Sequence, residues 1–300
     1  MILIQMPIER NTTAKTIRLL YPESVSGGLS TYRLGARLMA ATLPENETQP
    51  LVKIDVPALG KTGPTITNGI ASEPAVLEGI RKARAALEKE APERVVTVGG
   101  NCIVSLASFD HMHALYPEAG ILWIDAHPDV SLPENGYPNA HAMVLAALLG
   151  RGAPSLAKEL KNPAFGAKDL LYIGLQGLHD YQRKFLDDAG VDYAVQTEAF
   201  VSDERILAFL TEHPQVFVYL DIDVLDPAFF HDTYFANPEL VGDGSGGGRM
   251  TIEELGRILR IVSEKVETPA FTIAEYLPFE AERLANVFES LPLFTDKTKA

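Results

Sequence analysis

Hydrophobic residues along this chain follow two alternating patterns. Short, nearly continuous runs of β-branched and other apolar residues alternate with longer stretches in which apolar residues recur every three or four positions. The first pattern is typical of strands buried on both faces, and the second of helices that cover a sheet. The runs that predict strands are Arg94 to Val98, Gly120 to Ile124, Asp169 to Gly174, Val216 to Leu220 and Ala270 to Ala274. The sequence therefore predicts an α/β fold with a mainly parallel central sheet.

Two of the covering helices carry clear start or stop signals. One begins near Ser72 and ends before Pro92, and its apolar face is formed by Val76, Ile80, Ala83 and Leu87. The other begins at Thr251, which is followed by Glu254 at the spacing of a capping box. We find no internal repeat and no linker rich in Pro, Gly and Ser, so the chain is expected to form a single domain over residues 1–300.

Composition narrows the possible partners and the compartment. The formal net charge of −14 repels phosphate, so nucleic acid and anionic membrane surfaces are not expected partners. Cys102 is the single cysteine, so no disulfide can form within the chain. The apolar start, Met1 to Ile8, is short for a signal peptide, and no apolar run approaches the roughly 18 residues of a membrane helix. These features predict a cytoplasmic protein.

Polar residues with ligand-type side chains follow four of the predicted strands. Ligands of open α/β sheets bind beyond the carboxyl ends of the strands, so these positions are the first candidates for a site. The four segments are Gly99-Gly100-Asn101-Cys102, Asp125-Ala126-His127-Pro128-Asp129, Asp221-Ile222-Asp223 and Ala274-Glu275.

The spacing within two of these segments predicts a metal site. Residues two apart on extended backbone point the same way, so Asp125, His127 and Asp129 could face one point, and Asp221 and Asp223 repeat the pattern. Carboxylates crowded in a partly dry site need a compensating cation. Carboxylates outnumber imidazole here, which favours a hard or borderline ion such as Mn²⁺, and two ions about 3.5–4 Å apart would match the ligand number. The alternative is that these acidic residues cap helices or lie in solvated loops.

Two further features lie outside those segments. His141 lies at the start of an apolar helix expected to run to about Leu149, where it is either an ordinary helix-terminal histidine or part of the site. The glycine-rich stretch Gly242 to Gly248 lacks the lysine of a phosphate-binding loop, so we expect a mobile loop that shapes a pocket.

Taken in order, these motifs resemble those of the ureohydrolases, the family of arginase, agmatinase and formimidoylglutamase. The resemblance runs from about Arg18 to Pro278, and its most specific parts are DAHPD at 125–129 and LDIDVLDP at 220–227. It implies a three-layer α/β/α fold, a binuclear Mn²⁺ centre, a small guanidino or amidino substrate, hydrolysis of a C–N bond by a metal-bridging hydroxide, and assembly as a homo-oligomer.

The resemblance also implies roles for individual residues. Asp125 and Asp221 would bridge both ions, with His127 and Asp223 completing one metal position and Asp129 and Cys102 the other. Asp129 would also pass a proton to the leaving amine, His141 would shuttle protons, and Glu275 would pair with the planar cationic group of the substrate.

The sequence departs from the family pattern at one place. Where the family has GGDH, this chain has Gly99-Gly100-Asn101-Cys102, so Cys102 replaces a histidine ligand. A thiolate would favour softer ions such as Zn²⁺, whereas a neutral thiol would leave the position weak or empty. Asn101 removes a carboxylate that could orient neighbouring ligands.

Two alternatives follow from the same residues. A catalytically silent relative would keep the fold and bind a small molecule or partner, with one metal or none. A zinc deacetylase is disfavoured, because that site has a tandem histidine pair and this sequence contains no His-His dipeptide.

Overall fold

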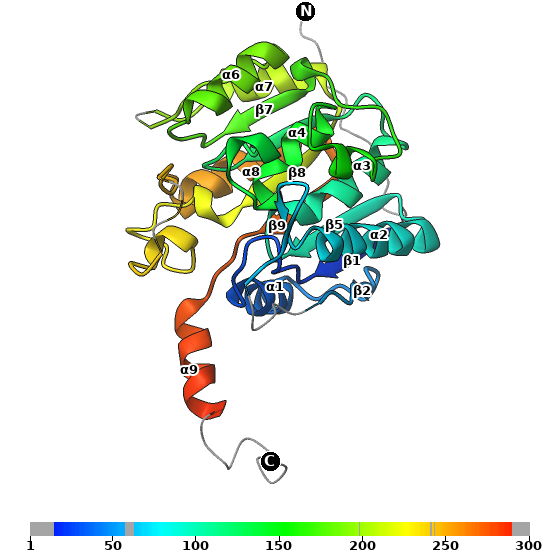
Figure 1. Cartoon of the computed structure of the whole chain (residues 1–300). Coiled ribbons are helices and arrows are strands. Elements are labelled where there is room, and N and C mark those ends of the chain that lie inside the picture. The colour runs from blue at the N-terminus through cyan, green and yellow to red at the C-terminus, as the bar shows by residue number, and fades with distance from the viewer. Residues whose placement is uncertain (1–14, 58–62, 198, 241, 243, 290–300) are drawn as a thin grey trace, which may run out of the picture.

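A seven-stranded sheet lies between two layers of helices in the computed structural model, which describes residues 15–57, 63–197, 199–240, 242 and 244–289 (Figure 1). The strands are β1 (Thr16–Tyr21), β2 (Leu51–Lys53), β5 (Arg94–Gly99), β6 (Gly120–Ile124), β7 (Leu170–Ile173), β8 (Gln215–Asp221) and β9 (Glu267–Ala274). Their order is β2-β1-β5-β9-β8-β6-β7, and every neighbouring pair is parallel. The predicted α/β/α fold with a parallel central sheet is confirmed.

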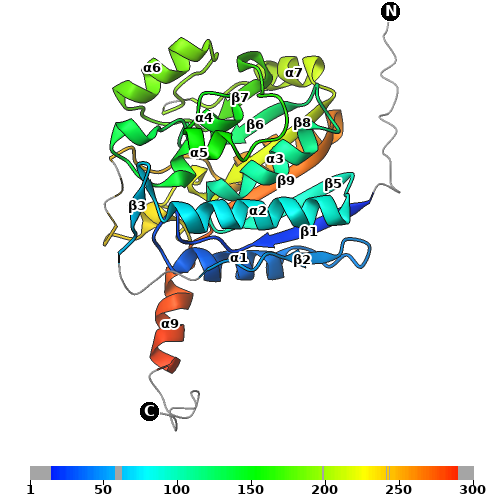
Figure 2. The ribbon, with the colours of Figure 1, turned by 45° about the vertical axis from the view of Figure 1, so that its right-hand side comes forward.

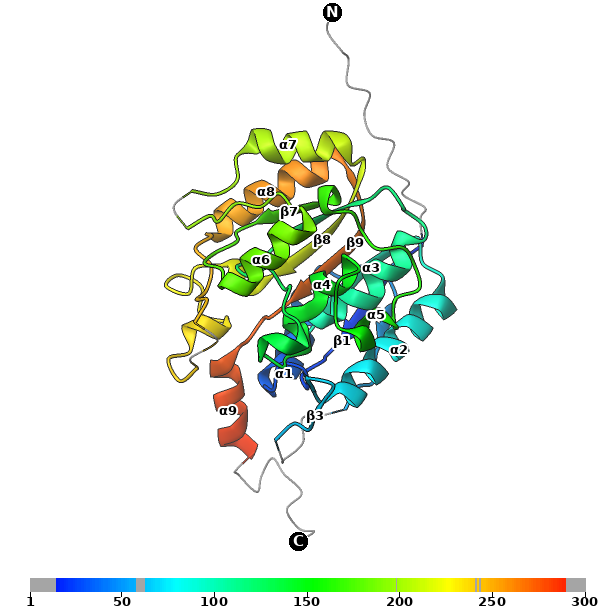
Figure 3. The same cartoon turned by 45° about the horizontal axis from the view of Figure 1, so that its top comes forward.

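Alternate residues of each strand feed two separate hydrophobic cores. Trp123 and Tyr219 belong to the core on one face, whereas Leu122 and Val218 belong to the core on the other. The first face is covered by α2 (Glu73–Glu90), α3 (Ser105–His113), α4 (Val144–Leu148), α5 (Pro154–Ala157) and α6 (Asp180–Ala189). The second face is covered by α1 (Thr31–Thr42), α7 (Asp203–Glu212) and α8 (Ile252–Lys265), of which α7 and α8 lie side by side (Figure 3).

All five predicted strands are present, but the sequence analysis missed two others. In β1 an arginine interrupts the apolar run, and Arg18 donates to the Gln49 side chain and the Pro44 carbonyl. The edge strand β2 has only three residues, each at least partly exposed. A small antiparallel hairpin, β3 (Ile66–Thr67) and β4 (Ile70–Ala71), was also not predicted. Strands this short carry too little periodicity to be recognised. The segment Met1 to Ile8 lies outside the described residues.

The predicted start and end of α2 and the predicted start of α8 are confirmed, although the cap of α8 is only half a capping box. The hydroxyl of Thr251 accepts a hydrogen bond from the Glu254 backbone N–H at 3.1 Å. The Glu254 carboxylate does not return the bond, because it pairs with Arg257 one turn later. Glu254 therefore links two turns of the helix instead of completing the cap.

The last helix of the described chain, α9 (Phe279–Glu289), extends away from the body of the molecule (Figure 2). Leu284, Val287 and Phe288 on this helix are exposed. Within the described ranges, no helix is long and apolar enough to cross a membrane.

Four neighbouring strands in the middle of the sheet end at the same edge. These are β5, β9, β8 and β6, and they are the strands that precede the four ligand-bearing segments of the sequence. The strand order therefore brings together segments that are up to about half the chain apart in sequence. Because the strands are parallel, the carboxyl ends lie at one edge, where the candidate site is found.

Gly35 allows α1 to approach the end of β9 closely. A Cβ atom at this position would lie 1.7 Å from the Tyr276 carbonyl oxygen, next to Glu275. We predict that Gly35→Ala destabilises the protein, because backbone must shift on one side of the contact. The matched control is Gly256→Ala in α8, where a Cβ would meet no atom within 4 Å. That change should stabilise the protein by up to about 1 kcal/mol through helix propensity. Urea denaturation of both variants tests the contrast, and equal effects would contradict it.

Candidate metal centre

Asp125 directly follows β6, and Asp221 is the last residue of β8. Each of these aspartates accepts a hydrogen bond from the side chain two positions earlier in the sequence. The Trp123 indole donates to Asp125 Oδ2 at 2.9 Å, and the Tyr219 hydroxyl donates to Asp221 Oδ2 at 2.8 Å. Trp123 and Tyr219 are partners in the β6–β8 register, and their rings stack with centroids 3.8 Å apart. The stack fixes both donors, and the donors fix both carboxylates.

Backbone N–H groups hold the other oxygen of each carboxylate. His127 N donates to Asp125 Oδ1 at 2.6 Å, and Asp223 N donates to Asp221 Oδ1 at 2.7 Å. Each carboxylate is thus oriented from both sides by groups two residues away. Each oxygen accepts one such bond and keeps lone-pair capacity for a further partner.

His127 and Asp223 form a close pair beside Asp125. The distance from His127 Nδ1 to Asp223 Oδ2 is 3.0 Å, and that to Asp125 Oδ1 is 3.5 Å. His127 Nε2 lies 3.0 Å from the Gly246 carbonyl oxygen, which can only accept, so Nε2 carries a hydrogen. The glycine-rich stretch therefore orients the imidazole so that Nδ1 faces the carboxylates. It also contributes Gly242 to the wall of the pocket.

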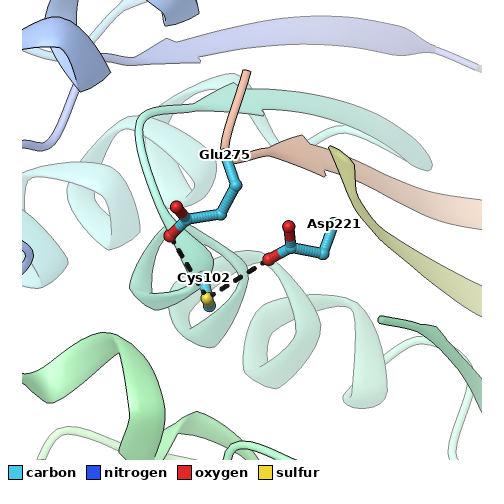
Figure 4. A group of neighbouring side chains, drawn as sticks. All are labelled: Cys102, Asp221 and Glu275. Atoms are coloured by element: carbon cyan, nitrogen blue, oxygen red, sulfur yellow. Dashed lines mark hydrogen bonds between the residues drawn. The ribbon is translucent and has the colours of Figure 1, made fainter. Parts of the chain in front are cut away.

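Cys102 lies between two pairs of carboxylates. Its Sγ is 3.6 Å from Asp221 Oδ2 and 3.6 Å from Glu275 Oε1 (Figure 4). Potential ligand atoms of Cys102, Asp125 and Asp129 also lie within 4.8 Å of one another. The described residues thus offer three groups for a metal ion, namely Cys102 with Asp221 and Glu275, Cys102 with Asp125 and Asp129, and Asp125 with His127 and Asp223.

Asp125, His127 and Asp129 do not meet at a single point as extended backbone would suggest. Strand β6 ends at Ile124, and Asp129 has a left-handed φ of +49°. The turn places His127 and Asp129 in different groups, and Asp125 belongs to both. Glu275 is likewise left-handed, with a φ of +64°, and its N–H donates to the Gly100 carbonyl. A non-glycine residue in such a conformation costs of order 1 kcal/mol or more, which surrounding structure must offset.

The site opens into a cavity of about 90 Å³. His141, in the 3₁₀ turn Ala140–Met143, lies on its wall with Tyr32 and Tyr137, and the Tyr137 hydroxyl is 3.4 Å from His141 Nε2. The full lining is Gly27, Tyr32, Cys102, His127, Asp129, Tyr137, Asn139, His141, Ala142, Gln182, Asp221, Asp223, Tyr234, Phe235, Gly242 and Glu275. Carboxylates and aromatic rings dominate this surface, which suits a small planar cation.

Asn101, which replaces an expected carboxylate, contacts another carboxylate instead. Its amide donates to the buried Glu23, which also accepts from Val25 N, Ser26 N and the Ser26 hydroxyl. Burial raises the pKa of Glu23, and these hydrogen bonds oppose the rise. An aspartate at position 101 would place two buried carboxylates in contact, so asparagine fits Glu23.

The electrostatics of the site reflect crowded, buried anions. Burial, together with the neighbouring Asp223, raises the pKa of Asp125 to about 6. Burial also raises the pKa of Asp129, Asp221 and Glu275 well above the usual carboxyl range.

The His127–Asp223 pair shifts in the opposite sense. Burial is the largest single effect and would lower the pKa of His127 and raise that of Asp223. The attraction and hydrogen bond between the two, with further contributions from Asp125 at His127 and from Asp221 at Asp223, together outweigh burial and reverse both shifts. Burial, followed by the effect of Asp129, raises the pKa of the Cys102 thiol well above its usual range.

The donor set fits divalent cations. Asp129 Oδ2 and Asp223 Oδ1 are buried and have no hydrogen-bond partner among the described residues. The described lining of the cavity contains no Lys or Arg to offset its carboxylates. Uncompensated buried charges cost several kcal/mol, which a bound cation would remove. Oxygen donors with one imidazole suit Mn²⁺, and the thiol extends the choice to Zn²⁺.

The sequence analysis missed the residues that support the site. Trp123 and Tyr219 precede their aspartates by two positions, so strand periodicity could have placed them on the same face. Tyr32, whose hydroxyl bonds the Glu275 carboxylate, and Glu23 come from distant segments and carry no local signal.

Comparisons with known proteins agree with the family resemblance of the sequence motifs. The model of the arginase family matches residues 22–282. Arginase from Schizosaccharomyces pombe is 27% identical over 210 residues, covering 66% of this chain and 62% of that protein. Agmatinase from Halalkalibacterium halodurans is 28% identical over 183 residues, covering 61% of this chain and 55% of that protein. The chain thus aligns with less than two thirds of the length of these curated relatives.

Solved structures extend the likeness over more of the chain. The crystal structure of Entamoeba histolytica arginase superposes with a TM-score of 0.68 at 20% identity, covering 88% of this chain and 91% of that one. At this level of identity the likeness concerns the fold, which confirms the three-layer architecture.

The raised pKa of Asp125 predicts how stability depends on pH without metal. Between the ordinary value of 3.8 and about 6, the folded protein binds a proton that the unfolded chain has released, so this contribution to stability is lost as the pH rises. Metal-free Asp125→Asn should therefore gain stability relative to the wild type with increasing pH, by up to about 1.4 kcal/mol per pH unit. Urea denaturation across this range measures the difference. A difference that does not vary with pH would contradict the prediction, and added Mn²⁺ should stabilise the wild type more than the variant.

Proposed function

This chain belongs to the arginase family, and we propose that it is a metal-dependent hydrolase that cleaves a C–N bond of a small guanidino or amidino compound. The observation that carries the proposal is the group of buried carboxylates at the ends of three neighbouring strands, β6, β8 and β9, beside a cavity without Lys or Arg in its described lining. Such a group is costly unless cations are bound. A small planar cation is also the substrate that this cavity would attract.

The proposed centre holds two ions, with Mn²⁺ as the expected metal. Asp125 and Asp221 would be ligands of both ions, with His127 and Asp223 completing one position and Asp129 and Cys102 the other, and Asp221 lies beside Cys102. When bound, the ions would offset the negative charge of the carboxylates and lower the pKa of a bound water molecule to near neutral. The Trp123 and Tyr219 donors would keep Asp125 and Asp221 in position as ligands.

Glu275 would recognise the planar group of the substrate. A carboxylate can accept two parallel N–H bonds from a guanidinium or amidinium, and this shape match orients the carbon to be attacked. The left-handed backbone, the N–H bond to Gly100 and the Tyr32 hydroxyl hold the carboxylate at the base of the cavity. Tyr234 and Phe235 would lie along the rest of the substrate.

Asp129 and His141 would carry protons. The unpartnered, buried Oδ2 of Asp129 can accept a proton from water and pass it to the leaving nitrogen. His141, on the cavity wall 3.4 Å from the Tyr137 hydroxyl, would exchange protons with solvent. The lone cysteine supports a cytoplasmic location, and assembly as a homo-oligomer follows from the family resemblance alone.

We predict that the purified protein binds Mn²⁺ and that Asp125→Ala loses most of this binding, because Asp125 belongs to two of the ligand groups. Elemental analysis after dialysis against Mn²⁺ gives the stoichiometry. The control is Asp188→Ala, which removes an exposed carboxylate on α6 and should leave the metal content unchanged. A wild type that takes up no divalent metal would favour the catalytically silent alternative.

Hydrolysis is tested with a panel of arginine, agmatine, guanidinobutyrate, guanidinopropionate, formimidoylglutamate and guanidine. Urea, formamide and ammonia are measured with protein loaded with Mn²⁺, Zn²⁺, Co²⁺ or Ni²⁺. We expect turnover of at least one compound, and its loss in His141→Phe with the metal content retained. Binding of metal without turnover of any compound would argue against hydrolysis and for a binding protein.

A further inference from the structure

The thiol of Cys102 makes contacts that an imidazole at this position would not make. A single S–H can donate fully to only one acceptor, yet Sγ lies 3.6 Å from both Asp221 Oδ2 and Glu275 Oε1 (Figure 4). All three side chains are buried, and all three line the cavity. One of the two carboxylates therefore receives no full hydrogen bond from the thiol.

These separations match the edges of a zinc coordination sphere. With Zn–S near 2.3 Å and Zn–O near 2.0–2.2 Å, tetrahedral angles place sulfur and oxygen ligands about 3.5 to 3.6 Å apart. Both observed Sγ–oxygen distances are 3.6 Å. All three side chains line the cavity, so an ion held by them would be accessible from it, as in zinc sites that act on substrates.

A second observation also points to an ion at the sulfur. Asp129 is 4% exposed, its Oδ2 has no hydrogen-bond partner among the described residues, and it belongs to a group with Cys102. A cysteine side chain is shorter than a histidine, so an ion bound to sulfur must lie nearer the end of β5. That position is next to β9, the strand that ends just before Glu275.

We propose that Glu275 is a metal ligand in this protein, and that Cys102 Sγ, Asp221 Oδ2 and Glu275 Oε1 together hold a Zn²⁺ ion distinct from the one beside His127. The inference rests on the proposed function only in requiring that the centre binds metal. The rest of the Glu275 carboxylate, with the Tyr32 hydroxyl, remains available to a substrate cation. Glu275 thereby joins the metal centre to the substrate cavity.

Cobalt reports on the sulfur directly, because Co²⁺ bound to a thiolate gives an intense near-ultraviolet charge-transfer band. We titrate metal-free wild type, Cys102→Ser, Glu275→Gln and Asp129→Asn with Co²⁺ and then displace it with Zn²⁺. The band should appear in the wild type and be absent in Cys102→Ser. Glu275→Gln should weaken Co²⁺ binding at Cys102 by at least about 100-fold. This is a larger loss than is usual when a residue that only orients a metal ligand is replaced. Asp129→Asn should retain the band and lose less affinity for Co²⁺ than Glu275→Gln.

The opposite pattern would overturn the proposal. A band that survives in Glu275→Gln with unchanged affinity, or a wild type without any band, shows that Glu275 and Cys102 do not share an ion. X-ray absorption of zinc-loaded wild type provides a measurement that needs no variant, and one sulfur among oxygen ligands is expected. These readouts do not depend on turnover, so an inactive protein with the band would refute hydrolysis while leaving the metal site supported.

Discussion

The concentration of negative charge at one edge of the sheet constrains the rest of this structure. Asp125, Asp129, Asp221, Asp223 and Glu275 are all buried, and burial, together with the repulsion among them, raises the pKa of each of these carboxyl groups except Asp223. His127 offsets only part of this charge, chiefly at Asp223. A fold that keeps these carboxylates together must bind cations or hold protons, and both states follow from the same geometry.

The buried carboxylates need rigid support, and the neighbouring strands β6 and β8 each provide a side-chain donor for one of them. Trp123 and Tyr219 stack across neighbouring strands and donate to the two aspartates beyond them. The stack lies in the hydrophobic core, so packing energy fixes the positions of polar donors. A metal centre built on these strands is therefore held by the core itself.

The residues around the departure from the family motif fit the residues that replace it. Asn101 fits the buried Glu23, and Cys102 leaves room for close contacts with Asp221 and Glu275. A buried Glu23 facing an aspartate at position 101 would add to the excess of negative charge. The segment is thus a consistent set of residues, and a thiolate in place of an imidazole would shift the preference of a bound metal toward softer ions such as Zn²⁺.

The sequence by itself determined five of the seven strands of the sheet, the covering helices α2 and α8, and the order of the ligand-bearing segments. These depend on local periodicity and on capping at residues such as Thr251, which act over a few positions. It also indicated that Asp125 and Asp221 would lie at one edge of the sheet, because both directly follow buried strand residues.

Only the tertiary structure decided which groups meet. Cys102 lies 119 residues from Asp221 and 173 from Glu275 in sequence, and they meet because β9 inserts between β5 and β8. Strand order is set by the packing of the whole sheet, which no local pattern encodes. The same reason explains why the contributions of Glu23 and Tyr32, which arrive from the N-terminal part of the chain, became visible only in the folded molecule.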